Sequence, residues 1–153
     1  LFTVVRKRVV LDVLRKEILE RLIALREGAG LPDGLMGRYM GWVLSSWEER
    51  GEDVVFRGAP HVLVATCHKD APCHEVDAII ALTTFDLYAH SNGVGTVWDG
   101  IFTAILQHFP ELKTRLGIPS DHVLGYAMAF GKPAVGYART VQRGPAQVNS
   151  VEL

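Results

Sequence analysis

The sequence predicts a domain in which helices cover both faces of a β-sheet. In several segments apolar residues recur every three or four positions, as along one side of a helix. Residues 61–67 and 122–131 are instead almost continuously apolar, as in strands that are buried on both faces. The two kinds of segment alternate along the chain, which is typical of a layered fold. The expected architecture is therefore an α/β/α sandwich.

In the first third of the chain, residues 1–6 are predicted to form a strand. A helix follows around the apolar stripe of residues 11–25, with Asp12 as a candidate for capping its start and glycines after its end. A second helix is expected over residues 35–50, with its apolar face between Met36 and Trp47. Residues 53–56 are expected to be short and extended.

The remaining elements begin with the strand at residues 61–67. A third helix is predicted over residues 75–91, with an apolar stripe made of Val76, Ile79, Ile80, Thr83, Leu87 and Tyr88. After it we expect a short strand or bend at 95–98, helices at 101–109 and 110–117, and the last core strand at 122–131. Residues 140–153 are too polar to form a core of their own and are interpreted as a C-terminal tail.

Composition and charge exclude several classes of protein. The 153 residues are enough to bury one core without covalent staples. The net charge of -1 argues against a nucleic-acid partner, which would require a strongly basic surface. No apolar run approaches the roughly 20 residues of a membrane-spanning helix, so no membrane partner is expected. With only two cysteines, the chain is expected in the reducing cytoplasm.

Two glycine-containing motifs resemble nucleotide-binding sequences but lack required residues. The segment G-V-G-T-V-W at 93–98 has tryptophan where a dinucleotide-binding fingerprint has its third glycine, and it follows a helix rather than a strand. In the segment 131–133, Gly-Lys is followed by proline, whereas a P-loop requires serine or threonine. Neither a Rossmann site nor a P-loop is therefore predicted.

A small cluster of cysteine and histidine follows the strand at 61–67. Cys67-His68 and Cys73-His74 supply good zinc ligands, but their spacing does not match a zinc knuckle and no second pair lies elsewhere. We therefore predict no metal site, and keep a metal-binding module as the weakest alternative. No G-x-S-x-G motif indicates a nucleophilic serine, and no catalytic side chain is assigned.

Three segments taken together indicate a protein family more specifically than any one of them does alone. Residues 77–100 join a long helix to the turn G-V-G-T-V-W-D-G, residues 116–133 join Leu-Gly-Ile-Pro to an apolar strand ending in Gly-Lys-Pro, and residues 137–139 read Tyr-Ala-Arg. Together these segments resemble the FMN-dependent nitroreductase family over nearly the whole chain. The resemblance implies an α+β fold with a mixed, mainly antiparallel sheet flanked by helices, in an intertwined homodimer.

The same resemblance implies a cofactor site and a reaction. Val97, Trp98, Asp99 and Gly100 would lie against the flavin, with backbone N–H groups near its N5 atom, and Arg139 would pair with the FMN phosphate. Trp98 is equally well interpreted as core. NAD(P)H would reduce FMN, which would pass the electrons to a small-molecule acceptor such as a nitroaromatic compound or a quinone.

The resemblance also predicts how the chain is divided. Residues 1–139 are expected to form a nitroreductase-like flavin domain that lacks its N-terminal segment, and residues 140–153 a tail that packs on the partner subunit. The apolar stripe from Leu11 to Leu25 and the face from Met36 to Trp47 are further interface candidates. The alternative from another functional class is a flavin-binding or structural relative without turnover.

Overall fold

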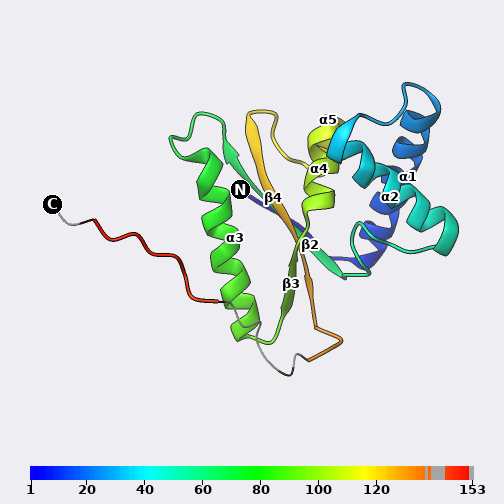
Figure 1. Cartoon of the computed structure of the whole chain (residues 1–153). Coiled ribbons are helices and arrows are strands. Elements are labelled where there is room, and N and C mark those ends of the chain that lie inside the picture. The colour runs from blue at the N-terminus through cyan, green and yellow to red at the C-terminus, as the bar shows by residue number, and fades with distance from the viewer. Residues whose placement is uncertain (137, 139–143, 152–153) are drawn as a thin grey trace.

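The computed structural model describes residues 1–136, 138 and 144–151, and for Glu75 the backbone only. Its centre is a four-stranded sheet in the order β1-β2-β4-β3, in which every described strand pair is antiparallel. The strands are β1 (Phe2–Val5), β2 (His61–His68), β3 (Gly95–Trp98) and β4 (His122–Gly131). Helices cover both faces of the sheet (Figure 1). The predicted α/β/α sandwich with a mainly antiparallel sheet is confirmed.

The larger core fills one face of the sheet. It lies under four helices, which are α1 (Arg8–Glu27), α2 (Gly34–Arg50), α4 (Gly100–His108) and α5 (Pro110–Arg115). Because side chains alternate between the faces of a strand, Val62 and Val64 of β2 point into this core together with Ala127 and Ala129 of β4. The small alanines leave room for α4, which packs across β4.

The apolar stripe of α1 belongs to this core. Leu11, Leu14, Ile18 and Leu22 are all buried, and none is more than 4% exposed. The expectation that this stripe serves as a subunit interface is therefore wrong, because the residues are already covered by the same chain. The helix also begins earlier than expected, at Arg8, and its N-terminal neighbour is Lys7 rather than Asp12. Asp12 instead forms an ion pair with Arg15 at 3.0 Å.

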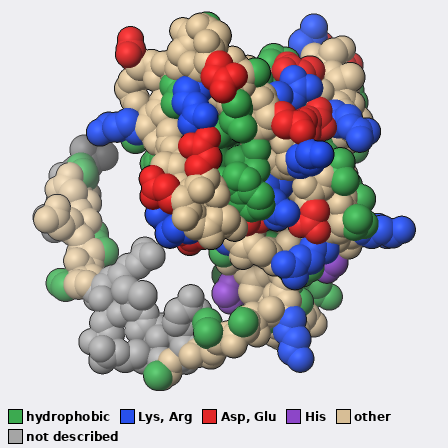
Figure 2. All heavy atoms as spheres, turned by 90° about the vertical axis from the view of Figure 1, so that its right-hand side faces the viewer, with side chains coloured by type: hydrophobic (Ala, Val, Ile, Leu, Met, Phe, Trp, Pro, Cys, Tyr) green, Lys and Arg blue, Asp and Glu red, His purple; other side chains and the backbone are tan. Residues whose placement is uncertain are grey.

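Charged side chains of both signs cover the outer surface of these helices, and Figure 2 shows them lying next to one another. Arg26 of α1 binds both carboxylate oxygens of Glu48 of α2, at 2.7 and 3.0 Å. The hydrogen bond to Glu48 raises the pKa of Arg26 and lowers that of the glutamate. Both side chains are exposed, so this pair contributes little to stability.

α3 (His74–Ser91) covers the opposite face of the sheet. Ala78 and Leu82 pack on Leu63, Ala65 and Met128. A Cβ atom placed on Gly125 of β4 would lie 2.2 Å from the Ala78 Cβ, so the helix rests directly on the strand at this point. This close approach positions α3 and, through the short turn that follows it, β3.

The predicted apolar stripe of α3 faces solvent and not the core. Its large residues are 37–70% exposed, namely Val76, Ile79, Ile80, Leu87 and Tyr88. The residues that meet the sheet lie on the other side of the helix, and the best buried are Ala78, Leu82 and Ala89. The structure therefore leaves an apolar helix face without a partner in the described part of this chain.

The segment before β2 also differs from the expectation. Residues 54–58 form consecutive turns rather than an extended stretch. The Asp53 Oδ1 atom accepts a hydrogen bond from the Phe56 N–H at 2.9 Å, which fixes the start of the turn. Val54, Val55 and Phe56 are buried, and for this reason their apolar run resembled a strand in the sequence.

None of the described helices is long and apolar enough to cross a membrane.

Candidate functional site

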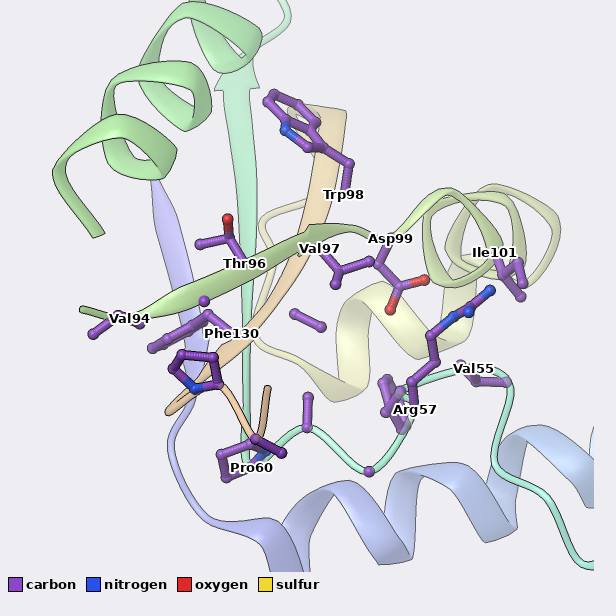
Figure 3. Close-up of a pocket in the computed structure, with 18 of the residues that line it drawn as sticks. Val55, Arg57, Pro60, Val94, Thr96, Val97, Trp98, Asp99, Ile101 and Phe130 are labelled. Atoms are coloured by element: carbon purple, nitrogen blue, oxygen red, sulfur yellow. The ribbon is translucent and has the colours of Figure 1, made fainter. Parts of the chain in front are cut away.

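A large cavity opens beside the edge strand β3. Its volume is about 980 Å³, within the range of small-molecule and cofactor sites. One wall is formed by β3, the following turn and the start of α4, and the opposite wall by residues 55–60 (Figure 3). The end of β4 and the residues after it, up to Val135, close a third side. The segment 97–100, predicted as a cofactor site, thus lies at the cavity.

The four predicted residues of that segment all line the cavity but differ in orientation. Val97 and Asp99 point into it, whereas the Trp98 indole points away, toward α3 (Figure 3). The indole packs edge-on against Tyr126, with ring centroids 5.4 Å apart. Its Nε1–H donates to Asp86 at 3.3 Å. Of the two interpretations of Trp98, the structure favours packing between β3, β4 and α3 for the side chain.

Gly100 stands where the chain passes closest to Tyr126. A Cβ atom at this position would lie 2.7 Å from the Tyr126 hydroxyl oxygen, a distance that real side chains do not tolerate. The glycine therefore allows the backbone to turn from β3 into α4 against the side chain of β4.

Hydrogen bonds fix this corner to the central strand. The Asp99 N–H donates to the Ala127 carbonyl at 2.9 Å, and the Ala127 N–H donates to the Thr103 hydroxyl at 2.9 Å. The same hydroxyl donates to the Asp99 carbonyl at 2.7 Å. One cycle of bonds therefore joins the turn after β3 to α4 and β4, and the cavity wall is preorganised.

The start of α4 presents unpaired hydrogen-bonding groups. The first backbone N–H groups of a helix have no partner within it. The Phe102 N–H is satisfied by the Asp99 Oδ1 atom at 2.9 Å. The N–H groups of Gly100 and Ile101 find no acceptor among the described residues. Both residues line the cavity, so a ligand with carbonyl or ring-nitrogen acceptors would satisfy donors that the chain leaves free.

Asp99 is itself unusual, since its side chain is buried with a residue exposure of 5%. Its Oδ2 atom has no hydrogen-bond partner among the described residues. Burial raises the pKa of Asp99 to about 7, because the charged form loses its hydration. The hydrogen bond from Phe102 and the charge of Arg57 act in the opposite direction.

Arg57 brings a positive charge to the opposite wall. Its backbone has a φ of 53°, in the left-handed region that non-glycine residues rarely adopt. The guanidinium lies 6.0 Å from the centre of the Trp42 ring. Figure 3 shows the Arg57 side chain directed toward the Asp99 carboxyl. Sequence reasoning missed this residue, because an isolated arginine before a glycine carries no recognisable motif.

On the α3 side of the sheet, Asp86 forms hydrogen bonds with polar groups of β3. Its carboxylate accepts hydrogen bonds from the Thr96 hydroxyl and the Trp98 indole. His90 lies within 3.4 Å of Asp86 and 3.0 Å of Thr96. The sequence offered no signal for this cluster, which depends on the packing of α3 against β3. These contacts hold the edge strand in place, since among the described strands only β4 pairs with it.

Two further expectations concern other parts of the chain. Arg139, the predicted phosphate ligand, lies outside the described residues, as does Tyr137. Cys67 and Cys73 are unpaired. Among the described residues, no three histidine, cysteine, aspartate or glutamate side chains stand close enough to hold a metal ion.

Solved structures with the same fold cover nearly all of this chain. A nitroreductase with bound FMN from Bacteroides fragilis matches with a TM-score of 0.64 and 20% identity, over 98% of this chain and 75% of its own. A nitroreductase with bound FMN from Desulfitobacterium hafniense matches with a TM-score of 0.63 and 23% identity, over 93% and 70%. At these identities the likeness shows the fold.

A third similar structure has a different activity. It is an iodotyrosine deiodinase bound to FMN and 3-iodo-L-tyrosine, with a TM-score of 0.58 and 16% identity, over 99% of this chain and 76% of its own. No curated protein matches the sequence. The family model described as "Nitroreductase family" matches residues 2–132, which include the whole sheet and the described cavity wall at 97–100. The chain therefore belongs to the nitroreductase family.

Proposed function

We propose that this protein is a flavin-dependent oxidoreductase that holds FMN in the cavity beside β3. The observation that carries the proposal is the start of α4, where two backbone N–H groups without an acceptor among the described residues line a cavity of about 980 Å³. A flavin ring is planar, largely apolar and edged with carbonyl and nitrogen acceptors. The residues present fit such a ring, and the family supports the choice.

When bound, FMN would accept a hydride from NAD(P)H and pass electrons to a nitroaromatic compound, a quinone or a similar acceptor. The chain's own residues would bind and orient it. The N–H groups of Gly100 and Ile101 would donate to the polar edge of the ring, and the Val97 side chain would contact its apolar part. The preorganised corner keeps these donors in place without reorganisation during the reaction.

For the phosphate, Arg139 remains the predicted ligand, through charge-assisted hydrogen bonds. The Arg139→Ala variant is expected to bind FMN more weakly while its affinity for riboflavin, which has no phosphate, stays the same. Equal loss for both ligands would contradict a phosphate contact, and so would no loss for either.

The two cysteines of the chain are free, and we place the protein in the reducing cytoplasm.

The partner that we propose is a second copy of this chain. The face of α3 that points away from the sheet exposes Ile80, Leu87 and Tyr88 by 62–70%. Phe2 and Val4 of β1 lie on the same side of the sheet as Leu63 and Ala65 and are also exposed. Apolar surface of this kind is typical of a protein interface. A homodimer would cover it, and residues 140–153 are proposed to pack on the partner subunit.

The cofactor assignment is tested with the purified chain and added FMN. We expect a yellow complex and quenching of flavin fluorescence on titration. NADH or NADPH should bleach the complex under nitrogen, and a nitroaromatic compound or a quinone should restore its colour. Binding without bleaching would indicate the non-catalytic alternative. Failure to bind FMN by any measure would overturn both flavin assignments.

A matched pair of variants tests the position of the site. Gly100→Ala places a methyl group against the Tyr126 hydroxyl and should weaken FMN binding, because either the Tyr126 side chain or the corner, both of which line the cavity, must shift. Adding Tyr126→Phe removes the oxygen that the methyl group meets, so the double variant should regain part of the affinity. An unchanged affinity in the single variant would place the cofactor elsewhere.

A further inference from the structure

Asp99 combines three features that the binding of a ring does not require. Its carboxyl is buried, its Oδ1 atom already accepts the Phe102 N–H, and its Oδ2 atom has no partner among the described residues. Figure 3 shows the carboxyl at the cavity wall, directed toward Arg57. A buried carboxylate oxygen without a donor is unfavourable, and binding a proton relieves the charge. Since Oδ1 acts as an acceptor, the proton belongs on Oδ2.

The groups around Asp99 do not compensate its charge fully. Arg57 on the opposite wall favours the ionised form, whereas Asp53 on the same loop disfavours it. Asp53 is itself engaged with Arg15 at 3.1 Å. Other titratable residues around the cavity come from α2, α3, β4 and the segment after β4, and they are Tyr39, His90, Tyr126 and Lys132. With burial as the largest effect, the pKa of Asp99 is raised to about 7.

We propose that Asp99 takes up a proton when a planar, uncharged ring system such as that of FMN fills the cavity, so that this side chain couples cofactor binding to pH. This inference rests on the proposed flavin site. A ring laid against the wall would exclude solvent from the cavity beside Asp99. The loss of solvent disfavours the ionised carboxyl, and the neutral form becomes the bound form.

The sign of the coupling follows from linkage. Below pH 7 Asp99 already holds its proton and binding changes nothing. Above pH 7 the free protein has lost the proton and the complex recovers it, so affinity falls as pH rises. Each unit by which the ring raises the Asp99 pKa lowers the affinity at high pH by up to about tenfold.

The experiment is calorimetric titration of the full chain in pairs of buffers that differ in ionisation enthalpy, such as HEPES and Tris. Riboflavin is the first ligand, because the FMN phosphate itself titrates near pH 6. We expect an uptake of up to about one proton per site at about pH 8 and none at about pH 6. Proton release, or no exchange at either pH, would overturn the inference.

Two variants identify the group. Asp99→Asn keeps an oxygen acceptor for the Phe102 N–H but cannot titrate, so it should bind riboflavin without proton uptake. Asp33→Asn changes an exposed aspartate at the start of α2 and should keep the full uptake. If Asp99→Asn does not fold, the two-buffer comparison on the unmodified chain still decides whether a proton is taken up. If no flavin binds at all, the proposed function fails; if flavin binds without proton uptake, only this inference fails.

Discussion

At the scale of single residues, the burial of Asp99 makes folding stability depend on pH. Its pKa is about 7 in the folded chain, against an ordinary value of 3.8. Between these values the folded state holds a proton that the unfolded state has lost, so stability falls as pH rises through this window. The full difference amounts to about 4 kcal/mol. We expect Asp99→Asn to abolish the part of this loss that falls between about pH 5 and about pH 8, as measured by urea unfolding.

The control for this prediction is Asp33→Asn, which also lies immediately before a helix. The Asp33 side chain is exposed and makes no hydrogen bond to the helix backbone. Its variant should follow the pH dependence of the unmodified chain. Parallel pH curves for the chain and for Asp99→Asn would show that the buried carboxyl does not control the slope.

At the scale of elements, two glycines predict opposite responses to the same substitution. Gly125→Ala would place a methyl group 2.2 Å from the Ala78 Cβ, and α3 would have to move off β4. Overpacking of this kind costs about 1–3 kcal/mol. Gly41→Ala in α2 meets only the Leu31 Cδ1 atom at 3.6 Å and should stabilise the chain by about 0.5–1 kcal/mol. Thermal and urea unfolding of both variants would check the signs.

The two substitutions separate packing from helix propensity. If Gly125→Ala were neutral, α3 would not rest on β4 as closely as the structure shows. If Gly41→Ala were destabilising, the space beside α2 would be filled by something other than the described residues. If the measured stability agreed with the expectation for one variant and not for the other, only the packing described for the second variant's element would be wrong.

Most elements could be predicted from the sequence, because their signals are local. The strand at 122–131 matches β4 residue for residue, and the helix at 35–50 is one residue short of α2, which Gly51 ends with a φ of 62°. The burial of residues 54–56 could not be distinguished from a strand by hydropathy. The start of α1 was missed because Val9 and Val10, in its first turn, are exposed and do not extend the apolar stripe.

The orientation of α3 and most of the site could not be predicted from the sequence, for a different reason. Hydropathy favours the apolar stripe of α3 that faces solvent, whereas the sheet contacts the side with Ala78 and Leu82, where Gly125 allows a close approach. The segment 97–100 was found through a family resemblance. Arg57, Asp86 and Tyr126 come from three other elements, and their meeting with that segment is a property of tertiary packing.

At the scale of the whole molecule, the apolar face of α3 predicts how subunits associate. We expect Leu87→Lys to convert a dimer into a monomer, because a charge would be buried where 70% of the leucine is now exposed. Light scattering coupled to gel filtration measures the change directly.

The control is Val13→Lys, which changes an exposed apolar residue of α1 on the other side of the sheet. It should leave the dimer intact, since α1 is outside the proposed interface. Dissociation by Val13→Lys and not by Leu87→Lys would move the interface to α1. A monomer in the unmodified chain would refute the proposed partner.

The hydrogen-bond cycle through Thr103 makes the two walls of the cavity unequal. The N–H groups of Asp99 and Ala127 donate within this cycle. On the facing turn the Ala59 N–H donates to the Phe56 carbonyl, and Arg57 has an unfavourable φ angle. In deuterium exchange, the amides of Asp99 and Ala127 should be the slow ones and those around Gly58 the fast ones. One wall of the cavity would then stay rigid while the opposite wall adjusts to the ligand that enters.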